Sequence, residues 1–311
     1  MHQLSMLNPP LQRNRNGHRY DDTYRLAIGP MRRTDRYDPT ANAVLFEGRC
    51  QDLLASMPNG CVQLVVTSPP YNIGKSYEHR TSLEQYVADQ ATVVAEVVRV
   101  VSDGGSICWQ VGNHVNKGEV TPLDAVLYPI FKSHRLKLRN RIIWHYEHGL
   151  HASKRFSGRY ETILWFTKGD EYHFNLDPLR VPQKYPNKKY YRGPRVGELS
   201  GNPRGKSPGD VWIIPNVKWN HVEKTKHPCQ FPVELIERLV LSMTRRSDLV
   251  LDPYGGVGSS VLAAVLNGRR GAMAEVVPEY IQIINKRLDA AEAGQLRTRP
   301  MDRPVYTPPK A

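Results

Sequence analysis

The chain has 311 residues and a mass of 35.4 kDa, enough for one large α/β domain with an insert or for two modest domains. Hydrophobic residues make up 40% and charged residues 23%, an ordinary globular composition that excludes wholesale disorder. Lys and Arg number 43 against 30 Asp and Glu, a formal net charge of +13. This excess favours a polyanionic partner, nucleic acid first, because cations that neutralise phosphates supply most non-specific affinity.

The cysteines and the apolar runs indicate the cellular compartment in which the protein works. No two of the four cysteines form a C-x-x-C pair, so the sequence predicts neither a disulfide framework nor a structural zinc. No apolar run approaches the roughly 18 residues needed to span a bilayer. The N-terminus lacks the apolar core of a signal peptide. We therefore expect a cytoplasmic protein with no membrane partner.

Both ends of the chain differ in composition from its middle. Residues 1–42 carry scattered arginines, aspartates and prolines without apolar periodicity, which predicts a flexible basic arm. Residues 292–311, rich in Pro and Arg, are interpreted as a flexible tail. The catalytic or binding domain is expected at residues 43–291.

Between these ends, strand and helix patterns alternate along the chain. Short apolar runs bounded by turn residues predict buried parallel strands, and Ser82 with Gln85 forms a capping box that opens a helix. The predicted strands are 43–46, 62–67, 106–111, 138–146, 160–167, 248–252 and 271–276. The predicted helices are 82–101, 123–133, 232–244, 259–266 and 278–290. This alternation predicts an α/β fold whose parallel sheet is covered on both faces.

Residues 175–226 interrupt the alternation with Pro, Gly, Tyr and many basic residues, around one apolar stretch at 211–215. We interpret them as an insert outside the core. Basic residues interleaved with aromatics suit phosphate and base contacts, although a solvated charged loop has the same composition. The expected DNA-binding residues are Lys184, Lys188, Lys189, Arg192, Arg195, Arg204 and Lys206.

A glycine-rich loop follows one predicted strand and opens a helix. It reads Asp252-Pro253-Tyr254-Gly255-Gly256-Val257-Gly258, with Ser259 beginning the helix. Glycines let the backbone approach a ligand closely, and a helix N-terminus favours a negative group. Glu275 ends the next strand, where α/β folds hold ribose hydroxyls, so a nucleoside ligand is predicted. A tight strand-to-helix turn is the structural alternative.

A second motif, Ser68-Pro69-Pro70-Tyr71-Asn72, follows another apolar strand. Two prolines fix the backbone there, so a hydroxyl and a carbonyl can accept both hydrogens of one NH2 group. An aromatic face beside them can stack on a planar ring. A rigid loop with no ligand is the alternative for this motif alone.

Together the two motifs resemble the beta class of S-adenosylmethionine-dependent DNA amino-methyltransferases, which methylate cytosine N4 or adenine N6. The resemblance spans about residues 43–288 and includes the blocks RYETILWFTKG and HPCQFPVELIERL. It implies a Rossmann-like methyltransferase fold: a mostly parallel twisted sheet with helices on both faces, circularly permuted motif order and a small DNA-recognition insert.

The resemblance also assigns roles. Ser68, Pro69, Pro70 and Tyr71 would hold a flipped base, and Glu275 would take the cofactor ribose. The remaining cofactor-binding residues would be Asp252, Pro253, Tyr254, Gly255, Gly256, Gly258, Ser259, His227, Pro228 and Phe231. The family often has Asp near the cofactor adenine where this chain has Arg49, so either Asp52 or the backbone near Cys50 is left for that contact.

The resemblance implies double-stranded DNA as substrate, S-adenosylmethionine as cofactor and a bacterial or phage origin. Ser68 favours cytosine N4, because the adenine enzymes mostly have Asp or Asn at that position. Adenine N6 stays open, and methylation of RNA or protein, or a silent DNA-binding module, are less favoured. A cognate restriction endonuclease and a homodimer are left open as partners. His145, His148 and His151 lack a carboxylate cluster, so no metal site is predicted.

Overall fold

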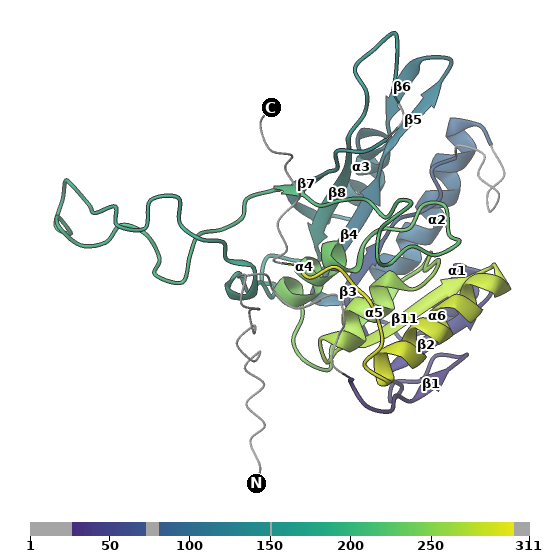
Figure 1. The fold of residues 1–311 in the computed structure, drawn as a ribbon. Helices are drawn as coiled ribbons and strands as arrows, with labels where there is room; N and C mark the ends of the chain where they lie inside the picture. Colours follow the sequence, from purple (N-terminus) through teal and green to yellow (C-terminus); the bar gives the residue numbers. More distant parts are fainter. Residues whose placement is uncertain (1–26, 73–80, 150, 302–311) are drawn as a thin grey trace.

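A nine-stranded sheet with helices on both faces forms the body of the computed structural model, which describes residues 27–72, 81–149 and 151–301 (Figure 1). Its strand order is β1-β2-β11-β10-β3-β4-β8-β7-β9. Within this sheet β8 runs antiparallel to both neighbours and the other pairings are parallel. The strands are β1 (Arg33–Thr34), β2 (Ala43–Glu47), β3 (Val62–Thr67), β4 (Val101–Val111), β7 (Lys137–His145), β8 (Tyr160–Thr167), β9 (Val211–Ile213), β10 (Leu249–Asp252) and β11 (Arg270–Glu275). The predicted mostly parallel α/β fold is confirmed.

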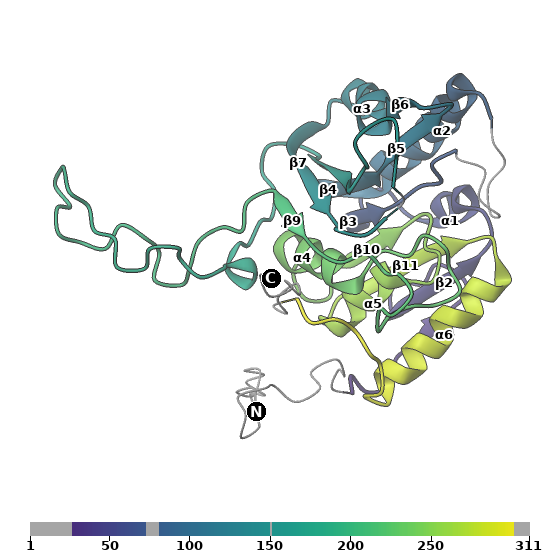
Figure 2. The same ribbon diagram turned by 45° about the horizontal axis from the view of Figure 1, so that its top comes forward.

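Six α-helices cover the two faces of this sheet in the described residues (Figure 2). One face packs against α1 (Cys50–Ser56), α2 (Leu83–Val100) and α3 (Leu123–Ser133), and the other against α4 (Val233–Met243), α5 (Ser259–Leu266) and α6 (Pro278–Glu292). Ser82 caps α2 by accepting a hydrogen bond from the Gln85 backbone at 3.1 Å, as the capping box predicted. None of the helices in the described ranges is long and apolar enough to cross a bilayer.

Several short elements were not predicted, among them a helix, a hairpin and a 3₁₀ turn. Helix α1 has seven residues, too few to show a helical apolar period. The hairpin of β5 (Asn113–Asn116) and β6 (Glu119–Pro122) is polar and exposed, so its sequence lacks the alternation of a half-buried strand. A single 3₁₀ turn, η1, spans Asp177–Leu179.

The predicted arm is corrected where the structure describes it. Residues 1–26 lie outside the described residues, but β1 pairs in parallel with β2 at the sheet edge. The Met31 backbone donates to Glu292 Oε1 at 2.7 Å, and Arg33 forms ion pairs with Asp289 and Glu292. These few polar contacts hold residues 27–42 against α6, and they leave no periodic pattern in the sequence.

The predicted tail needs the same correction. Residues 302–311 lie outside the described residues, but Leu296, Thr298 and Arg299 are buried. Arg299 Nη1 lies 2.6 Å from Glu234 Oε2 on α4, and its backbone N–H donates to Glu223 Oε1 at 3.1 Å. A buried ion pair therefore holds residues 294–301 on the body, although their composition resembles that of a frayed end.

The predicted insert consists of two parts with different structures. Its apolar stretch is not outside the core: β9 pairs in parallel with β7, and Trp212 and Ile214 are buried in the core. Residues 181–206, called here the projecting segment, extend away from the body (Figures 1 and 2). Two isolated bridges, Val181 with Lys206 and Lys189 with Leu199, hold this segment together.

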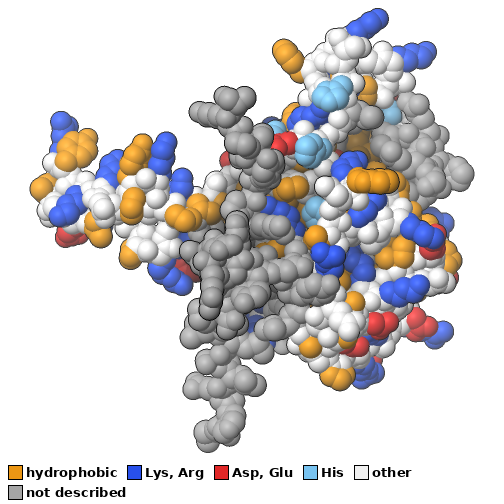
Figure 3. Space-filling model, viewed as in Figure 1, with side chains coloured by type: hydrophobic (Ala, Val, Ile, Leu, Met, Phe, Trp, Pro, Cys, Tyr) orange, Lys and Arg blue, Asp and Glu red, His pale blue; other side chains and the backbone are white. Residues whose placement is uncertain are grey.

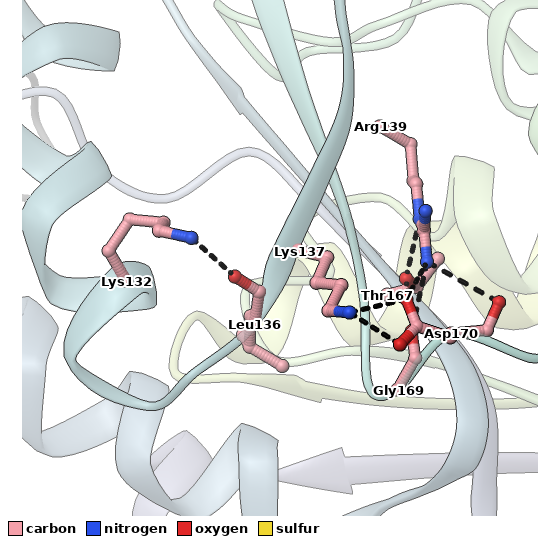
Figure 4. Close-up of polar contacts among 7 residues, drawn as sticks. All are labelled: Lys132, Leu136, Lys137, Arg139, Thr167, Gly169 and Asp170. Atoms are coloured by element: carbon pink, nitrogen blue, oxygen red, sulfur yellow. Dashed lines mark hydrogen bonds and ion pairs between the residues drawn. The ribbon is translucent and has the colours of Figure 1, made fainter.

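Polar contacts fix the end of the β7–β8 pair that lies away from the carboxyl ends of the parallel strands (Figure 4). Lys137 Nζ lies 2.5 Å from Asp170 Oδ1, in the turn that follows β8. Arg139 Nε donates to Thr167 Oγ1 at 2.9 Å, and Nη2 donates to the Gly169 carbonyl at 3.0 Å. With this end anchored, the opposite end of both strands can contribute side chains to a site.

Candidate active site

A cavity of about 610 Å³ opens at the edge of the sheet where the parallel strands end. Because β10 pairs with both β3 and β11, the loops that follow these three strands reach the same edge. The cavity is lined by Ser68, Pro69, Pro70 and Tyr71 after β3, by Pro253, Tyr254, Gly255, Gly256 and Ser259 after β10, by Glu275, and by His227, Pro228 and Phe231 before α4. The two sequence motifs thus meet around one cavity.

Two predicted ligand residues do not line the cavity. Asp252 is fully buried: Oδ1 accepts from Thr67 Oγ1 at 2.5 Å and from the Tyr254 backbone at 3.1 Å, and Oδ2 accepts from Ser260 Oγ. Burial raises the pKa of Asp252 to about 6. The carboxyl group therefore shapes the glycine-rich loop and ties it to β3 from behind the cavity wall.

Gly258, the other predicted residue outside the lining, makes a close approach inside the fold. It precedes α5 with φ +75°, a conformation that favours glycine. A Cβ there would lie 2.2 Å from Ile284 Cδ1, inside van der Waals contact. Glycine is required here for packing of α5 against α6.

Glu275 is held at the cavity by the loop it faces. Its two carboxylate oxygens accept one backbone N–H each, from Gly256 at 2.9 Å and from Val277 at 2.8 Å. Burial raises the pKa of Glu275. Each carboxylate oxygen keeps a lone pair for a further donor, so the group can receive two hydroxyls.

His227 closes the same side of the cavity. A Cβ on Gly256 would lie 3.2 Å from His227 Nε2, so the ring leaves little room beyond the glycine backbone. Burial, with the nearby Lys224 charge, lowers the pKa of His227 to about 4. The imidazole is therefore neutral at pH 7 and brings no positive charge to the cavity.

Arg49 is the residue at which this chain departs from the family pattern, and the sequence left either Asp52 or the backbone near Cys50 to contact the cofactor adenine. Arg49, Cys50 and Gln51 line the cavity beyond the end of β2, whereas Asp52 is exposed and does not. Of the two alternatives, the segment around Cys50 is therefore the one that reaches the cavity.

The loop after β3 belongs to a polar network that the sequence reasoning missed. Tyr71 OH donates to Glu161 Oε2 at 3.0 Å and lies 2.9 Å from Ser68 Oγ. Gln110 Nε2 donates to Tyr71 OH at 3.2 Å and also to Glu161 Oε2. Tyr146 OH donates to Glu161 Oε1 at 3.4 Å. A lone carboxylate within the apolar run of β8 was the available sequence signal.

Glu161 also sets the protonation of its neighbours. Burial raises the pKa of this carboxyl group, and the bonds from Tyr71 and Gln110 oppose that rise. Burial and the Glu161 charge together hold the pKa of Tyr71 well above its usual value. The phenol therefore stays protonated and remains a donor.

The remaining candidates fall into two groups. Of the three histidines, His148 lines the cavity, and the described residues contain no cluster of three or more His, Cys, Asp or Glu side chains suited to a metal. The predicted DNA-binding residues all lie on the projecting segment, away from the cavity lining, where basic and hydrophobic side chains alternate (Figure 3). Two of them already form ion pairs, Arg195 with Glu198 and Arg204 with Asp177.

A mostly parallel sheet that joins a glycine-rich loop, an acidic strand end and a Ser-Pro-Pro-Tyr loop around one cavity defines a Rossmann-like amino-methyltransferase. Residues 62–286 match the family model N6_N4_Mtase, described as DNA methylase. The chain belongs to this family of DNA amino-methyltransferases, and the resemblance noted in the sequence is confirmed.

Three curated relatives illustrate the family's range. Type II methyltransferase M.BglII of Bacillus subtilis is 51% identical over 77% of this chain and 67% of its own length. Type II methyltransferase M.ScaI of Streptomyces caespitosus is 37% identical over 82% of this chain and 84% of its own. DNA adenine methyltransferase YhdJ of Escherichia coli (strain K12) is 30% identical over 76% of this chain and 80% of its own.

Solved structures share the fold. PvuII DNA methyltransferase (cytosine-N4-specific) has a TM-score of 0.63 at 20% identity and covers 86% of this chain and 89% of its own. TTHA0409 of Thermus thermophilus, complexed with S-adenosyl-L-methionine, has a TM-score of 0.58 at 28% identity and covers 82% of this chain and 97% of its own. At its identity, the PvuII likeness establishes the fold alone.

Replacing Asp252 by Asn should change how stability depends on pH. A pKa of about 6 in the folded state, against 3.8 ordinarily, means that folding favours the protonated carboxyl group. The contribution of Asp252 to the free energy of unfolding is fully present below about pH 4. About 3 kcal/mol of it is lost as the pH rises through 6. Urea unfolding from pH 4 to 8 should therefore show Asp252→Asn gaining stability relative to wild type as pH rises. The exposed Asp103→Asn is the control, and a constant difference would contradict the prediction.

Proposed function

We propose that this chain methylates the N4 amine of a cytosine extruded from double-stranded DNA, with S-adenosylmethionine as methyl donor. The observation that carries the proposal is Ser68, a neutral hydroxyl acceptor, in the same cavity as the glycine-rich loop and Glu275. Membership of the DNA methylase family supports the reaction type.

The cavity residues fit the cofactor. Glu275 has lone pairs free for the two ribose hydroxyls, and backbone near Cys50 borders the place left for adenine. The glycine-rich loop and His227 would enclose the methionine part of the cofactor. Gly256 places backbone rather than a side chain against the His227 imidazole. When bound, S-adenosylmethionine supplies an electrophilic methyl group on a sulfonium centre.

The network at Glu161 orients the acceptor. Because Tyr71 donates its proton to Glu161, the Tyr71 oxygen can accept the proton of Ser68. The lone pairs of Ser68 Oγ then face the cavity, and the Pro69 carbonyl is a second acceptor. Accepting both hydrogens of an exocyclic amine shifts its nitrogen toward sp3 geometry and aims the lone pair at an electrophile.

Extrusion of the base needs compensation, because unpairing and unstacking cost a few kcal/mol. The Tyr71 ring lines the cavity beside Ser68 and can stack on the base. A Cβ on Gly112 would lie 3.2 Å from Tyr71 Cε2, so glycine gives the ring its room. The pocket thus offers a stacking face and two acceptors in one place.

Ser68 favours cytosine as the target base, because the adenine enzymes of this family mostly have Asp or Asn at that position. A neutral hydroxyl is a weaker acceptor than a carboxylate, so geometry and the Pro69 carbonyl must contribute more. Adenine N6 is the second candidate, which the similarity to the adenine methyltransferase YhdJ favours.

The product identifies the base. DNA from a methylation-free host that expresses the chain should yield N4-methylcytosine on nucleoside mass spectrometry, and single-molecule sequencing should map its site. Host DNA from cells expressing Ser68→Ala is the control. Finding N6-methyladenine instead would overturn the choice of base but not the family.

Replacing Glu161 by Gln should lower kcat on the order of 10- to 100-fold, because the Ser68 proton is no longer directed away from the amine. Cofactor affinity should stay unchanged, since Glu161 lies on the side of the cavity away from Glu275. Wild-type kcat should also fall in acid as Glu161 protonates, with a midpoint above its ordinary 4.5, and the variant should lack this limb. Tyr71→Phe, which keeps the ring, should reproduce the loss. An unchanged kcat in Glu161→Gln would exclude this role.

The projecting segment is proposed to contact DNA phosphates. Replacing Lys188, Lys189 and Arg192 together by Ala should weaken binding and reduce the slope of log K against log salt by up to about three. Lys286→Ala on α6 is the control for general charge loss. Equal slopes for triple variant and wild type would show that these cations face solvent in the complex.

The Type II relatives support a place in a restriction-modification system. We propose that a restriction endonuclease of the same sequence specificity accompanies this chain.

A further inference from the structure

Two aromatic side chains at the rim of the cavity are almost completely exposed: Phe156 at 99% and Trp219 at 95%. Phe156 lies between Arg155 and Gly158, which both line the cavity. Trp219 directly follows Lys218, another lining residue. Both rings are therefore next to residues that line the cavity.

The two rings stand on neighbouring segments. The segment that carries Phe156 follows β7, and the one that carries Trp219 follows β9, whose last residue pairs with the last residue of β7. Asn216 Nδ2 donates to the His148 carbonyl at 3.0 Å and joins the two segments. The strand pairing and this hydrogen bond therefore tie together the two segments that carry the aromatic side chains.

Local hydrogen bonds shape each tip. The Ala152 backbone N–H donates to Ser157 Oγ at 3.1 Å across the turn that holds Phe156. The His221 backbone N–H donates to the Lys218 carbonyl at 2.9 Å across the turn that holds Trp219. These bonds fix the turns in conformations that project the rings.

The exposure is selective. The other four tryptophans, Trp109, Trp144, Trp165 and Trp212, are between 0% and 6% exposed. The surroundings of the exposed rings are basic, with Lys154, Arg155 and Lys218 all at the surface. Lysine is depleted from protein interfaces, whereas aromatic rings among cations suit nucleic acid, in which rings stack on bases and cations pair with phosphates.

We propose that Phe156 and Trp219 enter the DNA duplex at the target base and occupy the space that the extruded base leaves. An apolar side chain inserted at a base step replaces the stacking that the neighbouring base pairs lose. This inference rests on the proposed function, because it requires a base that leaves the helix for the cavity.

The test compares two duplexes that carry the site mapped from the methylation product. One is fully paired, and the other has an abasic position opposite the target base, so that extrusion no longer breaks a base pair. On the paired duplex, Phe156→Ala/Trp219→Ala should lower kcat/KM on the order of 10- to 100-fold. On the abasic duplex the same variant should recover to within a few-fold of wild type.

Matched variants separate insertion from other effects. Phe156→Tyr and Trp219→Phe keep planar rings and should retain activity on both duplexes. Tyr191→Ala removes an exposed ring of the projecting segment and should affect both duplexes equally. If the alanine double variant also loses equally on both, the rings contact DNA without assisting extrusion and the proposal is wrong.

Trp219 provides a direct optical readout, because it is the exposed tryptophan among buried ones. Acrylamide should quench its emission in the free protein, and binding of the cognate duplex should protect it. Persistent quenching in the complex would overturn the proposal. A second result would also overturn it: the DNA-free double alanine variant sediments with a different mass from wild type but keeps its activity on paired DNA. The rings would then join two copies of the chain.

A failure of the proposed function gives a different result. If wild type produces N6-methyladenine, the same pair of duplexes is built around the mapped adenine, and the comparison between paired and abasic substrates still decides the role of the two rings.

Discussion

The hydrogen bond from Thr67 to Asp252, 2.5 Å long and fully buried, joins the ends of the two strands on which the site depends. Parallel pairing of β3 with β10 brings both loops to one edge, but register alone leaves each loop free to turn. Asp252 removes that freedom, since it also accepts from the Tyr254 backbone and from Ser260. The Ser-Pro-Pro-Tyr loop and the glycine-rich loop therefore keep a fixed spacing, which a transfer between two bound groups requires.

The two carboxylates in the cavity wall, Glu275 and Glu161, act differently because their donors differ. Glu275 is held by rigid backbone N–H groups of Gly256 and Val277, so it can accept further hydroxyls without moving. Glu161 is held by side-chain donors that themselves reach toward Ser68 through Tyr71. Glu161 therefore sets the direction in which the hydroxyl groups of Tyr71 and Ser68 donate their hydrogen bonds. Burial raises the pKa of both carboxyl groups, and the hydrogen bonds from their donors oppose that rise.

The sequence predicted the sheet, most helices and both motif loops because these depend on local patterns: apolar runs, the Ser82 cap and glycines before a helix. It did not predict contacts that join distant residues. The ion pair between Arg299 and Glu234 makes an apparently frayed end part of the body. Trp212 is in the core because β7 offers an open edge beside it, which no local pattern reveals. Glu161 was missed for the same reason, since its partners come from three other segments of the chain.

The strand order also separates the two ligands in space. Most residues that fit the cofactor follow β2, β11 and β10, and His227 reaches Gly256 from the segment between β9 and α4. The network at Glu161, the exposed aromatic rings and the projecting segment all arise around β8, β7 and β9, on the other side of the β10–β3 pair from β2 and β11. Substitutions in the segment after β7 and in the projecting segment, both proposed to contact DNA, therefore leave the glycine-rich loop undisturbed. A single sheet thus holds the cavity loops in place, while the segments proposed to contact DNA lie on connections that tolerate change better than the sheet does.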